Sequence, residues 1–281
     1  MSLLEQVALG FQALRFTALA LFRPRLWAPW LILGAVQLAV ILAIWMFAHP
    51  ALSWFMAPLL SGIAGEGVLH YPRVFELMPS LYDRVDVVMG SLLGAVVIGM
   101  ATPMYAAHFR GEPPEVGASL RAGARRTLPL VIVQLPLNLA VAALSMGVTA
   151  WLARRGGGLT TRVLGLVVTG ASLAVQALFF YAAARVMLKG EGPLAAWRGL
   201  ARSWRTGFVP AFVVGATTVI LLLPVHWLAG QVLTVVERGR PELAGWLTLM
   251  EAGSGLLNSF LLTGSATLIF LSALDEPEEE W

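Results

Sequence analysis

Long apolar runs alternate with short polar connections along the whole chain. Six of these runs cover residues 26–48, 85–107, 128–153, 163–188, 207–229 and 253–274. Each is at least as long as the stretch of roughly 20 mostly apolar residues that an α-helix needs to cross a hydrocarbon core of about 30 Å. The pattern therefore predicts an all-α integral membrane protein with six transmembrane helices.

The first, third and fifth runs are each preceded by an arginine-bearing stretch that leads through a proline into the run. In the first stretch, residues 3–22, apolar side chains recur at spacings of three and four, which is typical of one face of an α-helix. Residues 114–127 and 191–206 are its counterparts, and we expect all three to form basic amphipathic helices at the membrane surface. The recurrence predicts one membrane domain over 1–281, made of three hairpin-like units at about 3–107, 114–188 and 191–274, with an acidic tail at 275–281.

The basic stretches are candidate contacts with lipid headgroups or with a partner protein. In the third, an apolar stripe lies beside a basic stripe at positions i, i+4 and i+7, so apolar groups can enter the acyl boundary while guanidinium groups reach phosphates. The plainer alternative is charge that only sets topology, without lipid specificity. The candidate residues are Arg121, Arg125, Arg126, Trp197, Arg198, Arg202, Trp204 and Arg205.

The distribution of basic residues predicts the orientation in the bilayer. Twelve of the nineteen basic residues fall on one side if the N-terminus and the connections 108–127 and 185–206 face the cytoplasm. The positive-inside rule then places both termini in the cytoplasm. A basic turn at 154–158 is the one segment that this arrangement leaves on the outer side against the rule. The two long outer connections, 49–84 and 230–252, are apolar enough to contain interfacial helices.

Composition supports the membrane interpretation and excludes several other classes. Apolar residues make up 58% of the chain and charged residues 12%, against about half and about a quarter in soluble proteins. The net charge of +3 does not indicate nucleic-acid binding, because the basic residues lie beside apolar runs rather than in a separate basic domain. The absence of cysteine excludes disulfides, thiolate chemistry and cysteine-ligated metals.

Few polar residues interrupt the apolar runs. Asp86 and Arg185 fall near the ends of theirs, and without a central charge an ion-coupled carrier is less expected. Uncharged polar residues either line a narrow polar path or form hydrogen bonds between helices. They are Gln37, Gln134, Asn138, Gln176 and Asn258.

No set of residues predicts catalysis, a cofactor or a metal. The four histidines lack metal-site spacing, and a haem or pigment on His226 has only its place inside a run in its favour. Ser172 follows a glycine, as the nucleophile of rhomboid proteases does, but Leu173 stands where those proteases have a second glycine. We therefore expect a protein that is not an enzyme.

The repeated arginine, proline and hairpin pattern resembles the membrane domain of bacterial glycerophosphodiester phosphodiesterases and stand-alone six-span relatives. The resemblance lies in residues Phe11–Gly34, Ala118–Val141 and Ala195–Gly215. It implies a multi-pass protein of the bacterial cytoplasmic membrane. The soluble phosphodiesterase domain of that family is absent from this sequence, so its catalysis is not implied.

These patterns lead to one functional hypothesis and one alternative. The first is a non-catalytic scaffold, accessory subunit or lipid-organising protein, whose partners are anionic lipids and either other membrane subunits or further copies of the chain. The alternative is a permease or channel for a small solute, which would use the polar residues of the spans.

Overall fold

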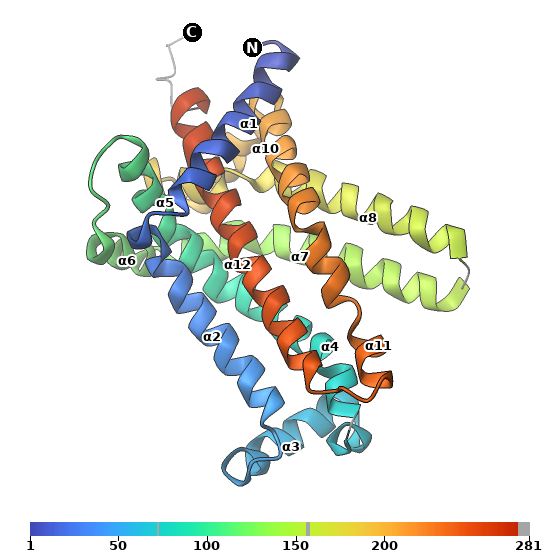
Figure 1. Ribbon diagram of the computed structural model, residues 1–281. Helices are drawn as coiled ribbons and strands as arrows, with labels where there is room; N and C mark the ends of the chain where they lie inside the picture. Colours follow the sequence, from blue (N-terminus) through green and yellow to red (C-terminus); the bar gives the residue numbers. More distant parts are fainter. Residues whose placement is uncertain (72, 156–157, 275–281) are drawn as a thin grey trace. The chain divides into compact units, whose positions relative to one another are not determined.

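The computed structural model consists of helices and connecting turns throughout the residues that it describes (Figure 1). It describes the backbone of residues 1–71, 73–155 and 158–274, and the side chains of these residues except 63–64, 145–166 and 273–274. Within this part, six helical segments are long and apolar enough to cross a membrane. The chain is an all-α, multi-pass membrane protein, as the apolar runs predict.

Each of the six spans overlaps one predicted run, but the second, fifth and sixth begin well before it. They extend over Pro24–Trp45, Arg73–Phe109, Thr127–Leu144, Val167–Leu188, Pro193–Glu237 and Leu243–Ser272. Residues 73–84 and 243–252, predicted to lie in outer connections, are therefore the first turns of the second and sixth spans. The acidic tail and the centre of the basic turn at 154–158 lie outside the described residues.

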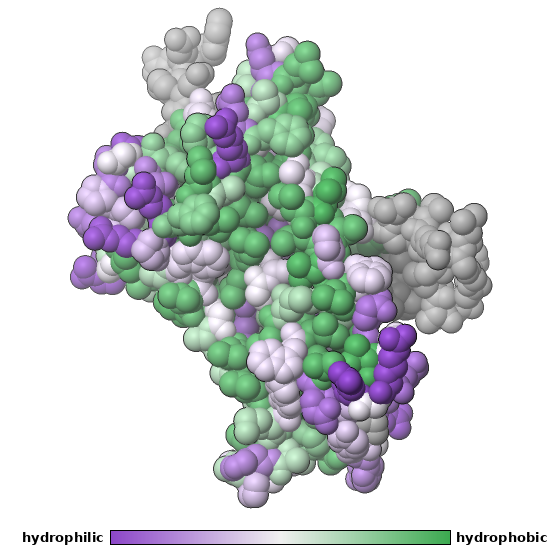
Figure 2. Space-filling view, in the orientation of Figure 1, coloured by the Kyte–Doolittle hydropathy of each residue, from purple (hydrophilic) through white to green (hydrophobic). Residues whose placement is uncertain are grey.

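The surface of the spans remains largely apolar. Leu31, Leu38 and Leu42 of the first span are all exposed, as are Ile220 and Leu221 of the fifth. Figure 2 shows hydrophobic residues over much of the visible surface of the long helices α2 (Ala28–Trp45) and α12 (Leu243–Ile269). Exposed apolar surface of this extent is unfavourable in water and suits contact with lipid.

The chain forms two compact units. The first contains Met1–Trp30, Gly90–Val219 and the chain from Ser259 onward, and the second contains Leu31–Met89 and Ile220–Asn258. These units follow contacts in space and do not test the predicted repeat of three hairpins, which stays a prediction. The first unit holds α1 (Leu3–Ala20), η1 (Pro24–Trp27), η3 (Gly90–Gly94), α5 (Ala95–Phe109), α6 (Val116–Arg125), α7 (Thr127–Arg155), α8 (Gly158–Phe179), α9 (Ala182–Leu188), most of α10 (Pro193–Ala229), the end of α12 and η4 (Phe270–Leu274). The second holds most of α2, α3 (Pro50–Ala64), η2 (Glu66–Leu69), α4 (Arg73–Met89), the end of α10, α11 (Val232–Glu237) and the start of α12.

Helix α1 begins at a capping box in which the Ser2 hydroxyl accepts from the Glu5 amide and the Glu5 carboxylate accepts from the Ser2 amide. Its buried face packs within the first unit. A Cβ on Gly10 would lie 2.9 Å from the Pro210 carbonyl oxygen, and the Ser265 hydroxyl donates to the Thr17 hydroxyl at 3.3 Å. The predicted helix is present, but it contacts α10 and α12 rather than lying on the membrane surface alone.

Helix α10 is continuous from Pro193 to Ala229, so the separate surface helix predicted over 191–206 is wrong. Pro210 lies inside it and does not end it, because a transmembrane helix tolerates proline where its neighbours satisfy the backbone. Its 37 residues span about 55 Å, well beyond a hydrocarbon core of about 30 Å. The arginine-bearing first turns are thus a rigid extension of the span.

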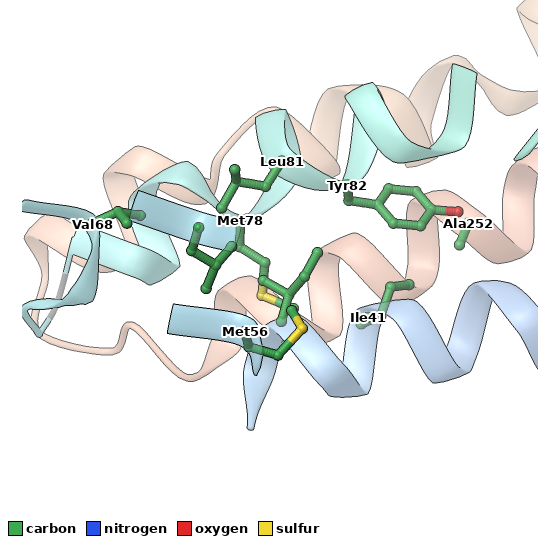
Figure 3. Packing of buried hydrophobic residues seen from close by; sticks show 9 residues of the cluster. Ile41, Met56, Val68, Met78, Leu81, Tyr82 and Ala252 are labelled. Atoms are coloured by element: carbon green, nitrogen blue, oxygen red, sulfur yellow. The ribbon is translucent and has the colours of Figure 1, made fainter. Parts of the chain in front are cut away.

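The second unit has a core built from α2, α3, α4 and α12. Figure 3 shows Ile41, Met78, Leu81, Tyr82 and Ala252 converging there. At one end of this core, Trp45 lies edge-on to Trp246, with ring centroids 5.9 Å apart. Tryptophan pairs of this kind are typical of the membrane–water interface.

Candidate functional site

The first turns of α10 have one basic, exposed face and one tightly packed face. Arg198, Arg202 and Arg205 are all exposed, at the predicted i, i+4 and i+7 positions. On the opposite face Gly199 and Gly207 are buried. A side chain at Gly199 would overlap the Arg185 guanidinium of α9, and one at Gly207 would overlap the Tyr181 ring. The two glycines hold α10 in place and so fix the direction of the arginines.

Large apolar side chains accompany these arginines. Trp204 is 52% exposed and Leu194 is 65% exposed, and both lie on the same first turns of α10. In helix α6, Arg121 and Arg125 are also exposed, and Arg121 Nε donates to the Gly117 carbonyl oxygen at 3.1 Å. Charged and apolar groups on one surface match the two layers of a lipid monolayer, the headgroups and the acyl chains.

Helix α6 is held against α5 by a close backbone approach. A Cβ on Gly123 would lie 2.8 Å from the backbone nitrogen of Met100, so only glycine fits without a backbone shift. Gly117, on the same helix, has open space around it. The arginines of α6 are therefore fixed relative to α5.

Two of the predicted contact residues also connect helices. Arg126 donates to the Val186 carbonyl oxygen at the end of α9, where helical carbonyls lack partners of their own. The Trp197 indole donates to the Val133 carbonyl oxygen at 3.4 Å and links α10 to α7. The predicted set therefore divides into exposed residues (Arg121, Arg125, Arg198, Arg202, Trp204 and Arg205) and two residues that connect helices.

A buried ion pair lies behind the basic face, and the sequence analysis did not identify it. Arg185 is 8% exposed, and its Nη1 lies 3.1 Å from a carboxylate oxygen of Glu191. Its Nη2 donates to the Ser203 hydroxyl at 3.5 Å, so one side chain joins α9, the following turn and α10. The turn at Gly190, whose φ is +71°, brings the two charges together. The available signal was an acidic residue six positions after Arg185, directly after the glycine of the turn.

The residues of the predicted polar path are divided between the two compact units. Gln134, Asn138 and Gln176 belong to the first compact unit, and Gln37 and Asn258 to the second. Gln37 does make a contact between helices, since its Nε2 donates to Asp86 Oδ1 at 2.9 Å. The Asn258 Oδ1 atom is buried and has no hydrogen-bond partner.

The position of Asp86 corrects the expectation that no charge lies inside a span. The helix that carries it starts at Arg73, and its partner Gln37 is the tenth of the 18 residues of α2. Asp86 therefore lies at the depth of the middle of the first span. Among the described residues, no group of three or more metal-ligating side chains is arranged to hold a metal ion.

The chain matches no protein-family model, and neither curated proteins nor solved structures give a match. The class established by the fold is therefore that of multi-pass, all-α membrane proteins with six spans.

Proposed function

We propose that this chain is a non-catalytic, lipid-organising protein of the bacterial cytoplasmic membrane that gathers anionic lipids on its basic face. The exposed arginines of α10, on the same first turns as Trp204 and Leu194, are the observation that supports it, and the exposed arginines of α6 add to it. Each arginine near an anionic surface contributes about 1 kcal/mol of attraction, while the apolar groups add acyl contact. Such a surface also suits an accessory subunit that docks through its lipids.

The proposal includes an orientation in which the basic face and both termini lie on the cytoplasmic side. The excess of basic residues in these connections supports it through the positive-inside rule. The sequence contains no cysteine, so a single cysteine introduced at position 121 or 202 is the only thiol of each variant. Labelling of that thiol reports which side of the membrane the position faces. We expect a membrane-impermeant maleimide to label neither position in intact cells and both in inverted vesicles. Labelling in intact cells would contradict the orientation.

Lipid binding is tested with a matched pair of charge variants. Arg198→Gln/Arg205→Gln removes two exposed charges from the basic face, and Arg238→Gln/Arg240→Gln removes two exposed charges next to α11. Titration of phosphatidylglycerol into the purified protein, followed by native mass spectrometry, gives the affinities. We expect the first variant to lose about 2 kcal/mol, or about thirtyfold, at low salt, and the second to bind as the unmodified protein does.

Two outcomes would refute the lipid proposal. One is equal binding of phosphatidylglycerol and phosphatidylcholine by the unmodified protein, which shows no preference for anionic headgroups. The other is an equal loss in both double variants, which shows that overall charge rather than this face governs binding. A separate change, Trp204→Asp, should weaken lipid binding because it places a carboxylate among the headgroups.

A further inference from the structure

A carboxylate lies between two spans of the second unit, at a depth inside the hydrocarbon layer. Asp86 Oδ1 accepts hydrogen bonds from Gln37 Nε2 at 2.9 Å and from the Tyr82 hydroxyl at 3.3 Å. Gln37 lies eight residues before Trp45, so it is about 12 Å below the Trp45–Trp246 pair along α2. Ionisable side chains at such depth are costly to keep and usually mark a site of binding or transport.

The carboxylate has neutral partners only. Both donors bond the same oxygen, Oδ1, which leaves Oδ2 without either of them. Among the described residues, no basic side chain forms an ion pair with Asp86. The Arg185–Glu191 pair lies in the other compact unit. Two neutral donors thus hold Asp86 through one oxygen, which leaves the other oxygen available to a further donor.

The glutamine that bonds Asp86 also has an acceptor without a partner. Gln37 is 6% exposed, and its Oε1 atom is buried without a hydrogen-bond partner. Since Nε2 is committed to Asp86, the amide cannot turn over without losing that bond. A buried acceptor without a donor costs about 1–3 kcal/mol, so a ligand that donates to it is favoured.

A third helix carries another carboxyl group. Glu251 of α12 is half-buried. Figure 3 shows the Tyr82 side chain extending to Ala252, the residue after Glu251, which places α12 beside α4 here. Arg84, the basic residue nearest to Asp86 in sequence, is exposed on α4. Two neighbouring helices, α4 and α12, thus each carry a carboxyl group here, and α2 contributes the amide of Gln37 next to Asp86.

The helix that carries Asp86 changes its geometry directly after the site. Four residues beyond Asp86 the chain forms the π-helical turn Gly90–Gly94. Single π-helical turns within α-helices occur frequently at functional sites. We propose that Gln37, Asp86 and Glu251 form a binding site for a small cation that carries N–H donors, a protonated ammonium or primary amine.

The chemistry of the site selects this class of ligand. An ammonium group supplies one positive charge and several N–H donors, which match the Asp86 carboxylate, the Gln37 Oε1 atom and the Glu251 carboxylate. A quaternary amine has the charge but no N–H donor, so it leaves the Gln37 oxygen unsatisfied. The site is independent of the basic face, because it lies in the other compact unit and has the opposite charge.

Equilibrium binding of radiolabelled methylammonium tests the proposal. The full chain is placed in nanodiscs of phosphatidylcholine, which removes anionic lipid as a source of cation binding. We expect saturable binding that ammonium displaces and that tetramethylammonium, without N–H donors, displaces at least about tenfold less well. Absence of saturable binding, or equal displacement by the two ions, would overturn the proposal.

Three variants locate the binding within the molecule. Asp86→Asn and Gln37→Met should each weaken methylammonium binding by about tenfold or more, because each removes a group that contacts the cation. Glu66→Gln also removes a negative charge from the second unit, but Glu66 is exposed in the connection between α3 and α4, and binding should be unchanged. Equal binding by all three variants would overturn the assignment. If Asp86→Asn fails to fold, Gln37→Met and the competition between ions on the unmodified protein decide.

Discussion

The ion pair between Arg185 and Glu191 gives the sharpest test of how the first unit is held together. Glu191→Gln keeps the size of the side chain and one acceptor oxygen but removes the negative charge. The Arg185 guanidinium then remains 8% exposed, with the Ser203 hydroxyl at 3.5 Å as its other side-chain hydrogen-bond partner and with Nε already lacking an acceptor. A buried charge would lose its counter-charge while the surrounding helices stay in place.

The size of the effect follows from the burial of the two side chains. Removal of one partner from a buried ion pair costs about 3–5 kcal/mol. The Glu191 side chain is 21% exposed, so water can solvate part of the site, and the glutamine still accepts a hydrogen bond. We therefore expect Glu191→Gln to lower the free energy of unfolding by about 2–3 kcal/mol.

Reversible unfolding by sodium dodecyl sulfate in mixed micelles, followed by circular dichroism, measures this change. Glu112→Gln, at an exposed position in the same unit, is the matched control and should stay within about 0.5 kcal/mol of the unmodified protein. Arg185→Met/Glu191→Gln removes both charges and should recover at least about 1 kcal/mol relative to Glu191→Gln alone. A double variant no more stable than Glu191→Gln would refute the argument from an unpaired buried charge.

Two further predictions concern close contacts within the first unit. Gly123→Ala should destabilise the packing of α6 on α5 by about 1–3 kcal/mol, because its Cβ meets the Met100 backbone, whereas Gly117→Ala on the same helix should be neutral or stabilising by up to about 1 kcal/mol; the same unfolding assay compares them. Tyr181→Phe should cost about 1–2 kcal/mol, because the buried Tyr181 hydroxyl donates to the Gly207 carbonyl oxygen at 2.8 Å, and an unchanged midpoint of unfolding would contradict that role.

The spans were predictable from the sequence because a hydrocarbon core requires a fixed length of apolar helix, which a run of residues reveals directly. The contacts between helices were not. Gln37 and Asp86 are 49 residues apart, and no local pattern indicates that they meet. Asp86 was expected at the end of a run because the preceding turns of its helix, from Arg73, are polar and were interpreted as a connection.

Glycine spacing does not reveal the close contacts between helices either. Gly90 and Gly94 have the spacing of a close helix contact, yet Gly90 has no neighbouring atom that a Cβ would meet, and both residues lie in a π-helical turn. Close approaches occur instead at Gly10, Gly123 and Gly199, which no simple motif connects. The continuity of α10 through Pro210 was missed because proline ends helices in water, whereas packed membrane helices tolerate it.

The proline inside α10 gives the N-terminal helix a mechanical role. Pro210 lacks an amide hydrogen, so the Thr206 carbonyl has no partner one turn ahead and the helix is weakest there. Helix α1 lies across this point, with Gly10 against Pro210 and Val213. The contact with α1 therefore supports α10 at its weakest point. If this contact were lost, the arginine-bearing first turns of α10 could bend at Pro210.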